Sequence, residues 1–300
     1  MCIRDRIQAF EGHADVEEVI EDLEFIATLP QPSLASTSVQ EVDLGVQRVG
    51  MAGATPSGWA WVIDTGVDLT HPDLNVSAGL SKTMFRVGAA ATREDRDGHG
   101  THVAGIIAAI DNGIGTVGVA PGARVVGVKT LSVGGRGNLR KVIRACDYTA
   151  GIAAEGDVAN MSWGIGLRTE RRKRLLRNAV QRLGNRGIYV AIAAGNDSVD
   201  AANQYPASFN GTNIYTVSAM TAFTDVWAAF SNFGDDVDFC APGVDVLSLA
   251  PGGGTARMSG TSMAAPHVAG ILLVNSGEIY SDGTVIADPH LPADPIAVLE

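Results

Sequence analysis

One stretch decides how this chain is interpreted: Gly260-Thr261-Ser262-Met263-Ala264-Ala265-Pro266-His267-Val268-Ala269-Gly270. A glycine run at 252–254 precedes it and an apolar helical pattern follows it, so Ser262 stands at the predicted start of a helix. The first N–H groups of a helix lack partners within the helix, and the helix dipole favours negative charge there. This environment suits nucleophilic acyl transfer, whose transition state develops an oxyanion. The alternative role for Ser262 is a simple helix N-cap.

The composition sets limits on the function. With 300 residues and 46% hydrophobic content, the chain can bury a large core, as one major domain with an appendage. The net charge of −11 gives no support to nucleic-acid binding. Three cysteines without a CxxC spacing allow at most one disulfide and do not indicate zinc. The sequence shows no membrane-spanning run and no signal peptide.

Apolar runs alternate with helical patterns along the chain. Trp59–Asp64 predicts a buried parallel strand with Asp64 at its carboxyl end, where open α/β sheets place functional groups, although a turn-forming role is the alternative. Further strands are predicted at 125–128, 158–162, 188–194, 214–218 and 237–241, and helices at about 139–154 and 169–183. The pattern indicates an α/β fold with a mostly parallel sheet.

Two further polar groups follow glycines at predicted element ends. His99, between Gly98 and Gly100, opens an apolar helix and suits a proton shuttle. His102 lies three residues later, but without an HExxH pattern a metal pair is the weaker interpretation. Asn196 follows Gly195 at a strand end, as a turn residue or as a donor to an oxyanion. The GxGxxG match at 113–118 precedes a strand, the reverse of the dinucleotide-binding context.

Asp64, His99 and Ser262 supply a carboxylate, a base and a nucleophile in the chain order of subtilisin. The segments 62–68, 98–105, 193–196 and 260–270 resemble the four motifs of the subtilisin-like serine proteases, and the stretch after Asn196 leans to their proteinase K side. The resemblance covers about 58–270 and implies a three-layer sandwich with a mostly parallel central sheet flanked by helices. It also implies an acyl-enzyme mechanism in which Asn196 assists the oxyanion hole.

The same resemblance implies how substrate and ions would be held. A peptide would lie along Ser162, Trp163 and Gly164 beside Gly195, with Gly134 and Gly135 as the opposite wall. No cofactor is needed for the chemistry. A structural Ca²⁺ would take oxygen ligands, here Asp73, Asn112 and the carbonyls of Ile110, Ile114 and Thr116, and Asp238 resembles the acid of a weaker cation site.

These observations divide the chain into three parts. Residues 1–40 are expected to be a leader and propeptide remnant, 41–280 the peptidase domain and 281–300 a C-terminal tail without a second long helix. The propeptide would contain a short helix at 16–23 and an inhibitory tail near 29–36 that occupies the cleft. The expected protein is a monomeric endopeptidase, extracellular or in the cell envelope, with protein or peptide substrates and its own propeptide as inhibitor. The alternative from another class is a catalytically silent, peptide-binding pseudoprotease. An α/β-hydrolase esterase lacks support, since no GxSxG elbow is present and the triad order differs.

Overall fold

The computed structural model describes residues 24–26, 33–35 and 39–300, so the helix predicted at 16–23 lies outside the described residues. Its centre is a ten-stranded sheet with the order β14-β15-β11-β10-β9-β8-β3-β6-β4, and β5 also pairs with β6. The strand pairs in this sheet are parallel except for β14 with β15. The bounds are β3 Trp59–Asp64, β4 Asn75–Val76, β5 Lys82–Thr83, β6 Arg124–Lys129, β8 Val158–Met161, β9 Tyr189–Ala193, β10 Ile214–Met220, β11 Phe239–Pro242, β14 Tyr280–Thr284 and β15 Pro295–Val298.

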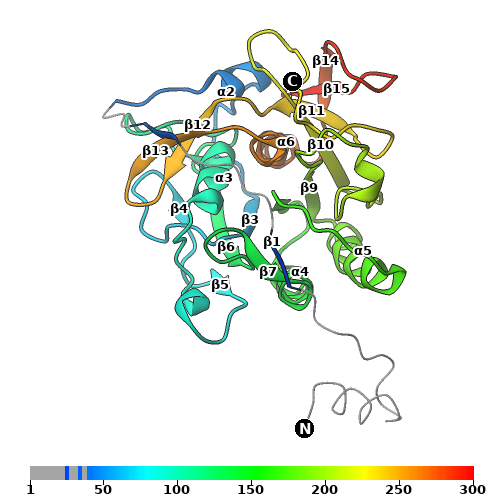
Figure 1. The fold of residues 1–300 in the computed structure, drawn as a ribbon. Coiled ribbons are helices and arrows are strands. Elements are labelled where there is room, and N and C mark those ends of the chain that lie inside the picture. Colours follow the sequence, from blue (N-terminus) through cyan, green and yellow to red (C-terminus); the bar gives the residue numbers. More distant parts are fainter. Residues whose placement is uncertain (1–23, 27–32, 36–38) are drawn as a thin grey trace.

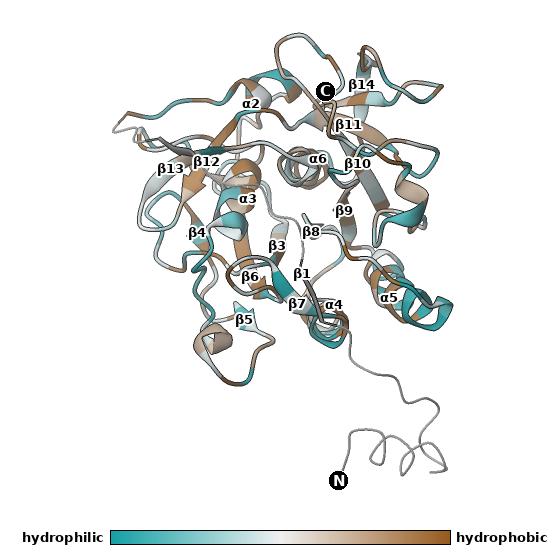
Figure 2. Cartoon of the chain, in the orientation of Figure 1, coloured by the Kyte–Doolittle hydropathy of each residue, from teal (hydrophilic) through white to brown (hydrophobic). Residues whose placement is uncertain are grey.

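Helices cover both faces of the sheet (Figure 1). On one face α3 (His99–Ala108) packs against α6 (Thr261–Val274), and on the other α4 (Leu139–Ile152) packs against α5 (Glu170–Gly184). Strand β3 serves both layers, because successive side chains of a strand point to opposite faces. Ala60 and Val62 belong to the core cluster beneath α3 and α6, whereas Trp61 and Ile63 belong to the one beneath α4 and α5. Figure 2 shows the hydrophilic residues of α5 on the side away from the sheet.

The expected α/β sandwich is therefore confirmed. Within residues 39–300, the strands and helices predicted from the sequence are present, with ends that differ by at most two residues. The short helix α2 (Leu44–Val49), which Asp43 caps, was not predicted. A second, three-stranded sheet was not predicted either; it consists of β12 (Val246–Ala250), β13 (Gly254–Met258) and β2 (Ser33–Ala35). Pro251, Gly252 and Gly253 turn the chain between β12 and β13, which pair as a hairpin, and Gly254 is the first residue of β13.

The C-terminal residues differ from the tail that we expected. Strand β15 joins the edge of the central sheet by parallel pairing of Ile296 with Cys240 in β11, and β14 folds back on it. Ile296 is 1% exposed, so burial of its side chain favours the strand. Asp294 accepts a hydrogen bond from Ser218 Oγ at 2.6 Å, and burial raises its pKa to about 7. Within the described residues, none of the helices combines the length and the hydrophobicity that a membrane span requires.

Candidate active site

The sheet order places the site. Strand β6 pairs with one side of β3, and strands β8 to β11 follow on its other side. The direction in which successive strands are added therefore reverses between β3 and β8. Ligands of open α/β sheets bind at the carboxyl ends of strands at such a switch point. Asp64 ends β3, and Ser162 directly follows the neighbouring β8. Ser262 reaches this edge, because its Oγ donates to the carbonyl of Ser162 at 2.9 Å.

Asp64 and His99 form a buried pair at this edge. The distance from His99 Nδ1 to Asp64 Oδ1 is 2.8 Å, and the two residues are 1% and 0% exposed. Thr65 N also donates to Asp64 Oδ1, at 2.6 Å. Burial opposes protonation of the imidazole, but the charge and hydrogen bond of Asp64 outweigh it and raise the pKa of His99. His99 Nε2 is buried and has no hydrogen-bond partner, so this nitrogen is available to a reacting group.

Glycine at position 100 allows the helix carrying His99 to approach the strand carrying Asp64. A Cβ at Gly100 would collide with the carbonyl oxygen of Gly66, two residues after Asp64. The N–H of Gly100 donates to Thr65 Oγ1 at 2.9 Å. The Gly-His-Gly pattern therefore has a packing reason beside the catalytic one.

Ser262 lies in the first turn of α6 with its side chain turned toward Ser162. Pro266, inside the same helix, has no N–H to offer the carbonyl of Ser262 four residues earlier. The hydroxyl of Ser162 donates to that carbonyl instead, at 2.9 Å. We expected Ser162 only as substrate-binding backbone. Its side chain thus also holds the first turn of α6 in place.

Asn196 is held in one orientation by the residue before Ser262. Its Oδ1 accepts from Thr261 N at 2.8 Å and from Thr261 Oγ1 at 3.0 Å. Since a backbone N–H can only donate, the amide oxygen faces Thr261 and the NH₂ group faces elsewhere. Gly195, with φ of 109°, has no room for a Cβ beside Asn232. The loop therefore presents a side-chain donor at the edge of the pocket.

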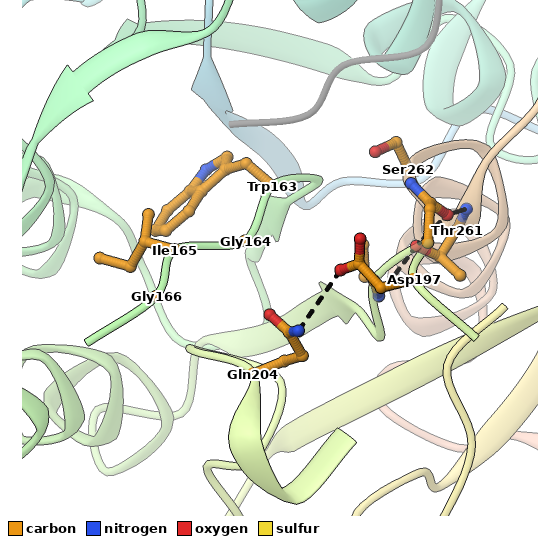
Figure 3. A pocket seen from close by; sticks show the side chains of 11 residues that line it. Trp163, Gly164, Ile165, Gly166, Asp197, Gln204, Thr261 and Ser262 are labelled. Carbon is orange, nitrogen blue, oxygen red and sulfur yellow. Dashed lines mark hydrogen bonds between the residues drawn. The ribbon is translucent and has the colours of Figure 1, made fainter. Parts of the chain in front are cut away.

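A pocket of about 190 Å³ adjoins Ser262 (Figure 3). Its wall contains most of the residues that we predicted on this side, and its members are Trp163, Gly164, Ile165, Gly166, Ala193, Gly195, Asn196, Asp197, Gln204, Thr261 and Ser262. The indole of Trp163 is 2% exposed and donates to Ile63 O at 2.7 Å, so it is a fixed wall. Asp197 is the one ionisable side chain in the lining and accepts from Gln204 Nε2 at 3.3 Å. The sequence analysis did not single out Asp197 or Gln204.

Gly134 and Gly135, which we predicted as the opposite wall, lie in a turn and are not among the residues that line this pocket. Both have positive φ, and Gly134 N donates to Asp97 Oδ2 at 2.8 Å. The next strand, β7 (Arg136–Asn138), pairs antiparallel with β1 (Glu24–Ile26). We expected 29–36 to occupy the cleft. The part of it that the structure describes, Ser33–Ala35, pairs with β13 instead, because the chain reaches the β7 edge several residues earlier.

Asp73 contacts the loop that contains the other predicted calcium residues. Asp73 Oδ1 accepts from Asn112 Nδ2 at 3.0 Å and its Oδ2 accepts from Thr116 N at 3.2 Å, while its backbone carbonyl accepts from Ile110 N. Asn112 Oδ1 accepts from Ile114 N at 3.1 Å. Gln40, which the sequence analysis missed, adds an amide oxygen that accepts from Asn112 N at 3.1 Å. The structure therefore brings the side chains of Asp73, Asn112 and Gln40 together.

The other metal hypotheses gain nothing from the structure. Asp238 at the start of β11 accepts from Thr216 N at 2.7 Å, and burial raises its pKa to about 6. His102 Nε2 donates to Ala256 O at 3.0 Å, and burial lowers its pKa to about 3. Among residues 39–300 no three His, Cys, Asp or Glu side chains form a group that could hold a metal ion.

Asp64 and His99 thus form a buried pair at the carboxyl edge of the parallel sheet, and Ser262 reaches the same edge from the first turn of α6. The sequence model of the subtilase family, peptidase S8, matches residues 61–277, and the chain belongs to this family of serine proteases.

Several relatives extend the comparison. The chain is 45% identical over 218 residues to a subtilisin-like protease of Coccidioides posadasii (strain C735), across 71% of this chain and 50% of that protein. It is 36% identical over 254 residues to subtilisin E of Bacillus subtilis (strain 168), across 82% and 64%. A crystal structure of a cold-adapted subtilisin-like serine proteinase superposes with a TM-score of 0.68 at 30% identity, across 86% of this chain and 97% of that one. The chain thus spans about half to two thirds of these curated relatives.

Proposed function

We propose that this protein is a serine endopeptidase in which Ser262 is the nucleophile, His99 the general base and Asp64 the group that orients His99. The observation that carries the proposal is the buried Asp64–His99 hydrogen bond of 2.8 Å, which leaves Nε2 of the imidazole without a partner. An imidazole held by a carboxylate through Nδ1 presents its other nitrogen as an acceptor for a hydroxyl proton.

The reaction begins with rotation of Ser262 about its Cα–Cβ bond, from the carbonyl of Ser162 toward His99 Nε2. His99 takes the hydroxyl proton while Oγ attacks the scissile carbonyl, and Asp64 stabilises the imidazolium. The Asn196 NH₂ group and the Ser262 backbone N–H donate to the oxyanion, since Asn196 Oδ1 is already held by Thr261. His99 then protonates the leaving amine. In the second half of the reaction, His99 takes a proton from water, the water oxygen attacks the acyl carbonyl, and His99 returns the proton to Ser262 Oγ as the acyl group leaves.

Substrate would bind as an extended strand between the two walls of the cleft. On one side, Trp163, Gly164 and Gly195 line the pocket, and Ser162 directly precedes them. On the other side, Gly134 and Gly135 lead into β7. The pairing of β1 with β7 supports this mode, because it shows that the β7 edge accepts an antiparallel strand.

A fluorophosphonate probe tests the nucleophile. We expect the wild type to be labelled and to cleave peptides, and Ser262→Ala to lose both. Asn196→Ala should retain labelling but lower kcat by about 10²–10³ with little change in KM, the magnitude that subtilisin, a member of the same family, shows for loss of such a donor. A folded wild type that neither reacts nor cleaves peptides, but binds them, would favour the pseudoprotease; equal changes in kcat and KM for Asn196→Ala would remove that residue from the oxyanion hole.

We further propose that residues up to about 40 are an inhibitory propeptide, which supports a role outside the cytoplasm or in the cell envelope. The support is the position of β1, which pairs with the edge proposed for substrate. A segment that occupies its own cleft keeps a protease inactive until it is removed. Monomeric assembly remains a prediction.

Calcium is the third part of the proposal. Asp73 is fully buried and has only neutral donors as partners, so burial raises its pKa to about 6. A carboxylate with amide and carbonyl oxygens is a donor set that suits Ca²⁺. Asp73, Asn112, Gln40 and the carbonyls at 110, 114 and 116 would hold the ion. Its contribution would be stability of this loop and not chemistry.

A further inference from the structure

Asp95 is a buried carboxylate that the mechanism does not use. It is 6% exposed and its two oxygens accept five hydrogen bonds. Oδ1 accepts from Thr65 Oγ1 at 3.0 Å and from two backbone N–H groups, those of Asp97 and Gly98. Oδ2 accepts from Thr101 N at 2.9 Å and Thr101 Oγ1 at 2.7 Å. One side chain therefore joins the residue after Asp64 to the first turn of the helix that carries His99.

Thr65 is the shared element of this network. Its N–H donates to the carboxylate of Asp64, its hydroxyl donates to Asp95 and accepts from Gly100 N, and its carbonyl accepts from Lys129. All hydrogen-bonding groups of Thr65 are thus engaged between the end of β3, which carries Asp64, and the start of α3, which carries His99. A shift of Thr65 would move Asp64 relative to His99.

Lys129 is the positive member of the network. It stands opposite Asp64 in the register of β3 and β6 and is 1% exposed. Its Nζ donates to the carbonyls of Thr65, at 2.5 Å, and Glu94, at 2.9 Å, rather than to a carboxylate. A buried ammonium is costly unless its donors are satisfied, so it holds these two carbonyls strongly. Glu94 directly precedes Asp95, and Lys129 thereby fixes both ends of the Asp95–Thr65 bond.

We propose that Asp95 and Lys129 are positioning residues for the Asp64–His99 pair, which they hold through Thr65 without touching substrate. The inference rests on the proposed function, in which this pair activates Ser262. Catalytic groups must keep their geometry closely, and a displacement of about 1 Å can cost about 10² in rate. The hydrogen bonds of Asp95 and Lys129 supply that restraint. Both side chains are buried, so they do not contact substrate themselves.

Asp95→Asn is the first variant to make. The amide keeps the shape of the carboxylate but turns one acceptor into a donor, which faces either two backbone N–H groups or that of Thr101. We expect kcat to fall about 10- to 100-fold with KM within about twofold. The charges of Asp64, Asp97 and Asp95 all raise the pKa of His99. Loss of the Asp95 charge should therefore move the acid limb of the kcat/KM profile to lower pH.

Asp157→Asn is the matched control. Asp157 is 5% exposed and accepts three hydrogen bonds, from Trp59 N, Trp61 Nε1 and Ala154 N, near the amino end of the same strand β3. It resembles Asp95 in burial and bonding but lies at the opposite edge of the sheet from Asp64. We expect it to lower the melting temperature while kcat and the acid limb stay as in the wild type.

A second pair of variants serves if Asp95→Asn does not fold. Thr65→Val removes the hydroxyl at nearly constant shape, and Thr65→Ser retains it. We expect about a tenfold loss of kcat for valine and recovery to within about twofold of the wild type for serine. Lys129→Met should lower kcat in the same way, since the carbonyls of Thr65 and Glu94 lose their common donor.

An NMR titration of His99 in a Ser262→Ala background separates this inference from the proposed function, because it needs no activity. The proton on Nδ1 reports the bond to Asp64, and Asp95→Asn should weaken this signal and lower the pKa of His99. If the imidazole titrates as before and kcat per titrated active site is unchanged, the positioning role is wrong. If wild-type protein does not cleave peptides but the titration shifts, the proposed function fails and the positioning role stands.

Discussion

At the scale of single residues, the pocket beside Ser262 carries one charge. Asp197 lies at its rim, exposed, where Gln204 donates to it (Figure 3). The wall behind it consists of Trp163, Ile165 and backbone at glycines. A lysine or arginine side chain has an apolar stem for such a wall and a cation for such a rim.

Asp197→Asn should therefore lower the preference for a basic residue on the acyl side of the cleaved bond. Exposed ion pairs contribute up to about 1 kcal/mol, so we expect the ratio of kcat/KM for lysine over norleucine to fall about fivefold. The effect should shrink as salt is added. Asp235→Asn is the control, because its side chain is 95% exposed and does not line the pocket. An unchanged ratio in Asp197→Asn would place the specificity elsewhere.

At the scale of elements, strand β1 shows how the N-terminal segment meets the peptidase domain. Its backbone pairs with β7 over three residues, Glu24–Ile26 with Arg136–Asn138. An edge strand with free N–H and C=O groups is a template for another strand. The segment and a substrate would compete for the same edge.

A synthetic peptide of residues 20–32 should inhibit peptide cleavage competitively. The same peptide with N-methyl groups on the backbone of residues 24–26 should inhibit about tenfold less well, since each lost hydrogen bond costs about 0.5–1.5 kcal/mol. Inhibition constants for both peptides check this. Equal inhibition would show that pairing with β7 does not hold the segment, and active enzyme that keeps an N-terminus before residue 30 would contradict the propeptide proposal.

At the scale of the whole molecule, the loop 110–116 connects Asp73 to the N-terminal residue Gln40. Gln40 N and Glu41 N donate to the carbonyls of Gly113 and Gly115, so this loop anchors the backbone at residues 40 and 41. An ion bound here would restrain segments that are far apart in the sequence. Its loss would be felt in the stability of the complete fold.

Calcium should raise the melting temperature of the wild type. At 100 times its Kd a ligand stabilises by about 2.7 kcal/mol, which corresponds to roughly 5 °C or more in a domain of this size. Asp73→Asn should abolish this response, whereas Asp238→Asn should keep it. Scanning calorimetry with added Ca²⁺ and with chelator measures both. A wild-type melting temperature that does not respond to either addition would remove the calcium proposal.

The amino-acid pattern alone predicts the alternation of strands and helices, because apolar runs and glycine-marked ends are local signals. It also determined which residues are candidates for the chemistry, since Asp64, His99, Asn196 and Ser262 each stand in a distinctive local motif. Strand β3 illustrates the limit of such signals. Its apolar run predicted a buried strand, but the neighbours β6 and β8, and hence the switch point, depend on pairing between distant segments.

The contacts that these residues make could be read from the three-dimensional fold alone. In the tertiary structure His99 forms a hydrogen bond with Asp64, the Ser262 hydroxyl donates to the carbonyl of Ser162, and Thr261 fixes the orientation of Asn196. The tertiary structure also brought Asp95 and Lys129 to Thr65, and β15 to the sheet edge, for which no local pattern gave a sign. The physical reason is that burial and hydrogen-bond geometry are properties of neighbours in space, whereas periodicity and motif spacing report only neighbours along the chain.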